Sequence, residues 1–222
     1  MEVNGYRIEP KANLSGAHLE NGDLKKAFLY DADLSGADLS GADLTDAKLI
    51  GADLRGANLL RSNLTGADLT ETNLTGANLT RANLTKARLH KAILTEANFK
   101  NANLLNVNLR AVTHLVGVNF SGVDLRELNL SGMNFENSNL TRVNMAWANL
   151  AGANLAGANL VGANLLGVNL IKANLTGAKI TKANLSKANL TGAKLLTSYL
   201  YSAAFNSANL TGAIMPDGTI HQ

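Results

Sequence analysis

The sequence predicts an all-β solenoid in which the chain turns once every five residues. A large apolar residue recurs at every fifth position from Leu14 to Leu109, and again from Leu115 to Met215. An α-helix rotates by about 140° over five residues, so these side chains would scatter around it. Side chains alternate across a strand with period two, so a straight strand would send every second leucine to the opposite face. A chain that buries all of them must therefore turn within each repeat.

The other four positions of the repeat have their own preferences. With the large apolar residue at position i, alanine is usual at i−2 and asparagine or aspartate at i−1. Serine or threonine is frequent at i+1, and glycine at i+2. Because side chains alternate, i and i−2 point inward while i−1 and i+1 face the solvent. Glycine at i+2 favours a tight turn with unusual dihedral angles.

One irregularity interrupts the repeat. Twenty centres run from Leu14 to Leu109 and twenty-one from Leu115 to Met215, forty-one in all. The step from Leu109 to Leu115 is six residues, so one extra residue lies within 110–114. We expect a locally irregular coil there, with the extra residue taken up as a β-bulge. Packing repair is the simplest interpretation of this segment, and a functional kink is the alternative.

This pattern resembles the pentapeptide-repeat family. Ala37-Asp38-Leu39-Ser40-Gly41 and Ala77-Asn78-Leu79-Thr80 are typical of its repeats, and residues 213–221 are similar to the tail of many cyanobacterial members. The resemblance implies a right-handed quadrilateral β-helix, with four pentapeptides per coil and about ten coils. We expect an N-terminal cap over residues 1–11, the repeats over 12–215, and a C-terminal cap over 216–222. Pro216-Asp217-Gly218 is a turn signal that should fold Ile220 back over the last coil.

Composition argues against several classes of function. The chain has no cysteine, which excludes disulfides and thiolate chemistry. Its four histidines are spread along the chain without converging metal ligands, and neither a catalytic triad nor a phosphate-binding motif occurs. We therefore expect no enzyme activity, no metal and no cofactor. The N-terminus lacks an apolar stretch typical of a secretory signal, so we expect a cytoplasmic protein without a membrane association.

An uncharged stretch over residues 145–171 provides the first candidate binding surface. Large apolar residues replace serine or threonine at i+1, where we expect them to be exposed, and a tryptophan occupies i+2. An exposed apolar patch is a candidate for binding a partner, and tryptophan is frequent at such sites. Tolerated drift in an alanine-rich repeat is the alternative. The candidate residues are Trp147, Val161, Leu166, Ile171 and Leu105.

The charges provide a second candidate surface. The net charge is +3, but residues 1–60 hold ten acids and six bases, whereas residues 61–111 hold seven bases and three acids. A predicted basic column occupies position i+2 and comprises Arg61, Arg81, Arg142 and Lys182. A solvated surface of mixed charge is the alternative interpretation.

These features favour a non-catalytic scaffold that binds an unidentified protein, as some members of the resembling family do. The alternative, also implied by the resemblance, is a mimic of duplex DNA that binds a type II topoisomerase such as gyrase. Such a mimic requires a long acidic face, which a chain of net positive charge does not provide. Sparse basic residues without interleaved aromatics argue against direct nucleic-acid binding. We expect a monomer or a weak homodimer.

Overall fold

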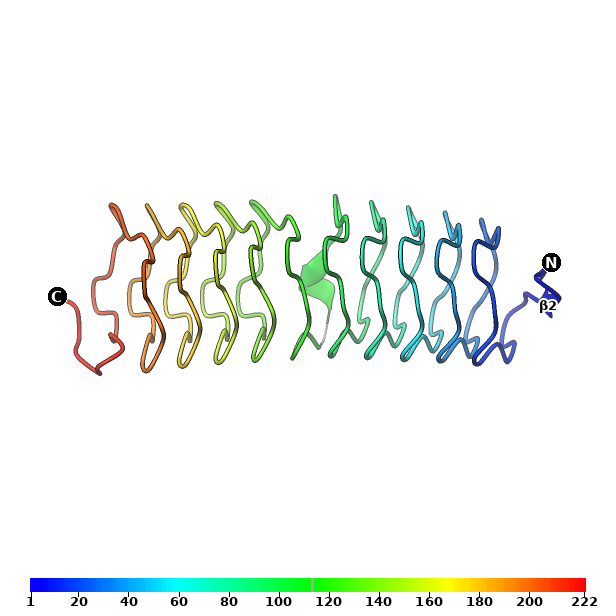
Figure 1. Cartoon of the computed structure of the whole chain (residues 1–222), viewed down its shortest axis with the longest axis horizontal. Helices are drawn as coiled ribbons and strands as arrows, with labels where there is room; N and C mark the ends of the chain where they lie inside the picture. The colour runs from blue at the N-terminus through cyan, green and yellow to red at the C-terminus, as the bar shows by residue number, and fades with distance from the viewer. Residues whose placement is uncertain (113) are drawn as a thin grey trace. The chain divides into compact units, whose positions relative to one another are not determined.

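The computed structural model describes residues 1–112 and 114–222, and it divides into two compact units, Met1–His114 and Leu115–Gln222. Both units consist of stacked coils of the same kind (Figure 1). The named elements are the short strands β1 (Glu2–Val3) and β2 (Tyr6–Arg7) and the 3-10 helix η1 (Leu109–Ala111). The chain is thus all-β with almost no helix, as predicted. Among the described residues, no helix is long and apolar enough to cross a membrane.

Parallel bridges between residues twenty apart hold the coils together. Asn13 pairs with Asp33, and Asp33 pairs in turn with Asp53. In the regular rungs the central leucine donates its N–H to the next coil, as from Leu14 to the carbonyl of Asp33 at 2.7 Å. Asp33 in turn donates its own N–H to the carbonyl of Ala12 at 3.0 Å. The residues that pair in this way are thus separated along the chain by the length of four pentapeptides.

A tight turn within each repeat bends the chain. The carbonyl of Leu14 accepts from the N–H of Ala17 at 3.0 Å, and Gly16 between them has a φ of 66°. A positive φ at the third residue only is the signature of a type II turn, so the expected role of glycine at i+2 is confirmed. Many repeats place another residue there, as with Lys26 at 56° and Trp147 at 62°. The backbone of these residues adopts a left-handed conformation that costs an L-residue about 1–2 kcal/mol.

The interior of each unit is filled by the leucine and alanine positions. Leu34 and Ala32 are both 0% exposed, as are most of their counterparts, so the inward orientation predicted from the period is confirmed. In the second unit, Phe120 and Phe135 pack edge to face with ring centroids 6.5 Å apart. Leu128 and Met133, which replace alanine at i−2, are only half-buried. Their larger side chains exceed the space that a methyl group fills.

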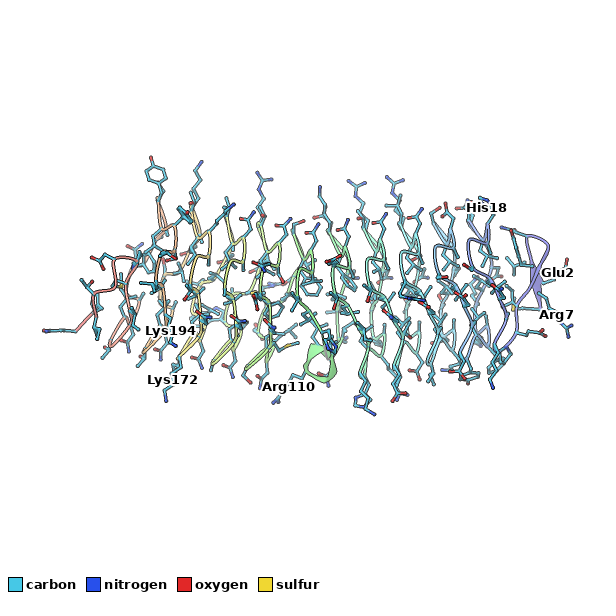
Figure 2. All side chains as sticks on the ribbon, turned by 90° about the horizontal axis from the view of Figure 1, so that it is seen from below. Glu2, Arg7, His18, Arg110, Lys172 and Lys194 are labelled. Atoms are coloured by element: carbon cyan, nitrogen blue, oxygen red, sulfur yellow. The ribbon has the colours of Figure 1, made fainter. Side chains whose placement is uncertain are left out.

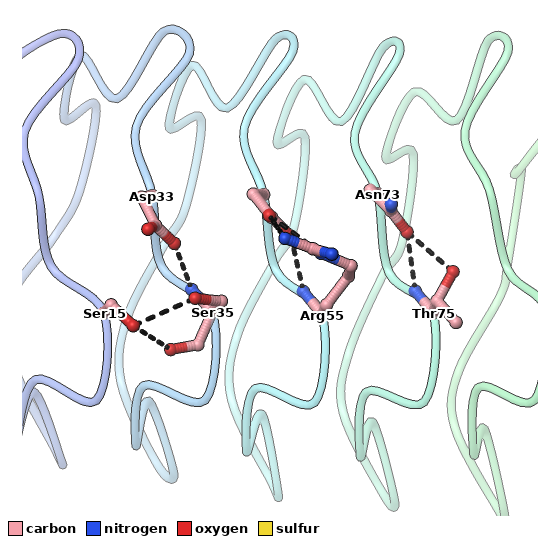
Figure 3. A network of polar contacts seen from close by, with 7 residues as sticks. Ser15, Asp33, Ser35, Arg55, Asn73 and Thr75 are labelled. Carbon is pink, nitrogen blue, oxygen red and sulfur yellow. Dashed lines mark hydrogen bonds and ion pairs between the residues drawn. The ribbon is translucent and has the colours of Figure 1, made fainter.

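Asparagine and aspartate at i−1 serve two purposes. Their Oδ1 accepts from the backbone N–H two residues later, as in Asp33 to Ser35 at 3.0 Å and Asn73 to Thr75 at 3.0 Å (Figure 3). This local bond, an Asx-turn, fixes the strand before the tight turn. Their amides also bond between coils, as Asn164 Nδ2 does to Asn144 Oδ1 at 3.0 Å. The Asx-turns were not expected from the sequence.

The amide column makes a specific prediction for Asn154. Its Nδ2 donates to Asn134 Oδ1 at 3.0 Å and to Glu136 Oε2 at 3.2 Å. Its Oδ1 accepts from the N–H of Ala156 at 3.2 Å and from Asn174 Nδ2 at 3.1 Å. Asn154→Ala removes all four bonds and should lower the free energy of unfolding by about 1–2 kcal/mol in urea titrations. Lys179→Ala, an exposed i−1 position, is the control, and an equal loss there would contradict the argument.

The two ends of the chain are closed differently. A hairpin with Asn4 and Gly5 at its turn joins β1 to β2. It places Val3 Cγ1 only 2.7 Å from where a Cβ on Gly22 would lie, which explains glycine at an i−2 position. At the other end, Ile220 forms an antiparallel bridge with Ile214. The chain therefore folds back along the last coil as expected, but the side chain of Ile220 is 67% exposed and is not buried there.

The irregular segment lies at the end of the first unit. Asn73 and Ile93 are bridged twenty residues apart, whereas Ile93 and His114 are bridged twenty-one apart, which confirms the extra residue. Before it, the chain forms η1, with Asn108 Oδ1 accepting from the N–H of Arg110. A 3-10 turn rises by about 2.0 Å per residue against about 3.3 Å in a strand, so it takes up length where a β-bulge was expected. Thr113, within the predicted segment, lies outside the described residues.

Candidate partner-binding surface

Trp147 lies on the surface of the second unit. Its backbone N–H donates to the carbonyl of Leu166 at 2.8 Å, which places these two residues in adjacent coils of one column. The residue is 55% exposed. One face of its ring covers Gly167, because a Cβ on that glycine would lie 2.2 Å from Trp147 Cε3. The indole is thus seated on the neighbouring coil while its other face meets the solvent.

The three aliphatic candidates are less exposed than predicted. Val161, Leu166 and Ile171 are all half-buried, because residues at i+1 stack on their counterparts in the adjacent coils. They also belong to different columns, since Asn159, Asn164 and Asn169 before them bridge to three different pairs of residues. The structure therefore brings Leu166 to Trp147 but does not join Val161 and Ile171 to them.

Leu105 belongs to the first unit. It is 60% exposed, and its carbonyl accepts from the N–H of Lys86 at 2.9 Å. Its exposure agrees with the expectation for a large apolar side chain at i+1.

The sequence reasoning missed a cluster of exposed apolar residues near the C-terminus. Tyr199 is 61% exposed, Tyr201 is 77% exposed and Leu196 is 41% exposed. Lys182 donates its N–H to the carbonyl of Tyr201, so this tyrosine continues the column of Val161. The signal was available, because tyrosine stands at positions that elsewhere hold asparagine, serine or threonine.

The basic column appears in each unit separately. Arg61 and Arg81 occupy adjacent coils, as do Arg142 and Gly162, with Lys182 one coil further. All four basic residues are at i+2 with φ between 54° and 59°. They form no ion pair with any other described residue. Figure 2 shows that the long side chain of Lys172 extends away from the coils.

Comparison with known proteins agrees with this repeat architecture. The family model of pentapeptide repeats matches residues 12–49, 42–81, 77–112, 113–142, 144–186 and 178–215. The chain belongs to the pentapeptide repeat family. Such proteins form right-handed β-helices and are in general structural or interaction proteins, not enzymes. A search of curated proteins gives no match.

Three solved structures of other pentapeptide repeat proteins are similar to this one. HetL, involved in heterocyst differentiation regulation in the cyanobacterium Nostoc sp. strain PCC 7120, is 34% identical, with 96% of this chain and 89% of HetL covered and a TM-score of 0.34. Rfr23 from the cyanobacterium Cyanothece 51142 is 27% identical, with 64% and 86% covered and a TM-score of 0.34. Full-length QnrB1, a plasmid-mediated fluoroquinolone resistance protein, is 18% identical, with 90% and 88% covered and a TM-score of 0.34.

Several aspartates of this pentapeptide repeat protein lie beside basic side chains. Arg55 forms an ion pair with Asp53, and its hydrogen bonds lower the pKa of the Asp53 carboxyl. Lys25 lies 3.4 Å from Asp43, and Arg88 lies 3.4 Å from Asp68. A partner would therefore meet alternating charges along these columns. The described residues contain no group of three or more histidines, aspartates or glutamates that could hold a metal ion.

Proposed function

We propose that this pentapeptide repeat protein is a non-catalytic scaffold that binds a partner protein through the surface around Trp147 and Leu166. The proposal includes the detailed architecture, a quadrilateral β-helix with about ten coils in total. Support comes from bridges that recur every twenty residues, as from Asn144 to Asn164 and from Asn164 to Asn184.

The observation that carries the proposal is the conformation of Trp147. A φ of 62° is unfavourable for a bulky residue, whereas glycine or asparagine adopts it readily. An indole that is 55% exposed also gains less from burial than a core side chain would. Trp147 therefore costs stability where glycine would not, which favours a role in recognition.

The same reasoning disfavours the alternative, a DNA mimic that binds gyrase. Duplex DNA carries one negative charge per ~1.7 Å of its axis, and a mimic must approach that density along one face. Here Asp43, Asp53 and Asp68 each lie beside a basic side chain. The paired charges support a protein partner whose surface carries both acidic and basic groups.

The test compares Trp147→Asn with a matched control, Lys187→Asn. Both positions lie at i+2 of the same column, with φ of 62° and 61°. We expect a protein captured from extracts of the source cell to bind the Trp147→Asn variant more than tenfold less tightly, since tryptophan anchors contribute about 2 kcal/mol or more. The Trp147→Asp, Leu166→Asp double variant should abolish capture, with an unchanged far-UV spectrum.

Two results would reject this proposal. Equal capture by wild type and Trp147→Asn would show that the indole is not the contact. Inhibition of supercoiling by purified gyrase would instead support the DNA-mimic alternative. The cap boundaries at residues 11 and 216, the cytoplasmic location and the monomeric or weakly dimeric state stay predictions.

A further inference from the structure

The regular ladder is incomplete in the part of the first unit that precedes the extra residue. In the regular coils the central residue and the residue at i+2 both donate to the next coil, as Leu69 does to Arg88 and Glu71 to His90, each at 2.8 Å. One coil later, the N–H groups of Leu89 and Lys91 have no acceptor among the described residues. Leu89 is 1% exposed, so its N–H is a buried donor without a partner. Such groups are rare because each costs about 1–3 kcal/mol.

The cause is the path of the chain before the extra residue. A regular coil would place Asn108 and Arg110 opposite Leu89 and Lys91, but these residues lead into η1 instead. Figure 2 shows Arg110 at this short helix. The diverted chain leaves a hollow of about 220 Å³, whose lining includes Leu89 and Asn108.

Basic side chains surround this hollow. Lys86, Arg88 and His90 all contribute to its lining. Lys86 is exposed and forms no ion pair with any described residue. Arg88 lies 3.4 Å from Asp68 in the preceding coil, and Lys91 lies 3.1 Å from Glu71. The acids that pair with Arg88 and Lys91 thus belong to the preceding coil, and no described acid of a following coil pairs with them on the side of the diverted chain.

We infer that this hollow binds a small oxyanion, such as a phosphate or carboxylate group. Its oxygens would accept from the backbone N–H group of Leu89, which lines the hollow, while Lys86 and Arg88 balance the charge; the N–H of Lys91 lies two residues beyond this lining residue. The carbonyl of Ala87 also lacks a donor among the described residues, and it lines the same hollow. A protonated phosphate oxygen can donate a hydrogen bond to this carbonyl, whereas acetate has no donor. Phosphate therefore satisfies more of the unpaired backbone groups than acetate does. This site is independent of the surface around Trp147.

The experiment is a titration of the uniformly ¹⁵N-labelled full chain with inorganic phosphate, followed by amide chemical shifts at constant ionic strength. We expect saturable shifts at Leu89 and Lys91. Lys86→Gln should weaken binding about tenfold, because it removes one charge-assisted contact. Lys26→Gln is the matched control, since Lys26 occupies i+2 of the same column at a φ of 56° and donates its N–H to Thr45 in an intact rung.

Parallel titrations with sulfate and acetate identify the source of the oxyanion. Shifts at Leu89 and Lys91 with phosphate alone would assign the hollow to phosphate groups, and equal shifts with acetate would assign it to carboxylates. Absence of shifts at these two amides with all three anions would overturn the inference. An equal loss of affinity in Lys26→Gln and Lys86→Gln would also overturn it, because general surface charge would then explain the binding.

Discussion

Replacement of Phe135 by alanine is expected to lower the free energy of unfolding by about 3–5 kcal/mol. The side chain is 0% exposed and lies at the centre of its coil. Its ring meets Phe120 in the edge-to-face geometry, with an interplanar angle of 65°. The substitution removes both the buried apolar area and this aromatic pair. Because each coil contacts only its neighbours, a cavity here weakens the stack at that position.

Equilibrium unfolding in urea, followed by far-UV circular dichroism, measures this loss. Phe28→Ala provides the control, because Phe28 is 57% exposed and stacks only on the ring of Tyr30 at 6.0 Å. We expect the control to lose less than about 1 kcal/mol. A loss of similar size in both variants would contradict the conclusion that buried Phe135 contributes more to stability than an exposed phenylalanine.

The interior of the fold could be predicted because it depends on one period. A repeat of five residues that must keep Leu34 and its counterparts on one side leaves only a chain that turns in every repeat. The twenty-residue circuit could not be obtained in this way, since parity fixes the turn but not how many turns close a coil. That step required the family resemblance. The Asx-turns at residues such as Asp33 were missed because a period gives the side of a residue, not its local hydrogen bonds.

The candidate site was less predictable for a related reason. Val161, Leu166 and Ile171 are neighbours in the uncharged stretch, but a five-residue step moves each to a different column. Trp147 and Leu166 meet because the circuit brings position i+2 of one coil beside the next coil. The hollow beside Leu89 arises from a rung that is lost upstream of the extra residue. A count of residues locates the insertion but does not show which coil loses its hydrogen bonds as a result.

The seat of Trp147 provides the second large expected effect. Gly167→Ala should lower the free energy of unfolding by about 2–3 kcal/mol, from two separable causes. Alanine at a φ of 62° is strained in the folded protein, but it also lowers the conformational entropy of the unfolded chain, which offsets part of that strain. The net cost is about 1 kcal/mol. The new methyl group would also lie 2.2 Å from Trp147 Cε3 and Cζ3, so the indole must leave the neighbouring coil. The remaining loss comes from the packing of its ring.

Gly152→Ala separates these causes. Gly152 has a φ of 67°, and a Cβ there would meet no atom within 4 Å, so only the backbone strain of about 1 kcal/mol applies. Trp147 is the single tryptophan of the chain, so intrinsic fluorescence reports on this seat alone. We expect a red-shifted emission in Gly167→Ala, because the displaced indole gains contact with water, and an unchanged emission in Gly152→Ala. Equal losses of stability with unchanged emission in both variants would mean that the indole does not rest on Gly167.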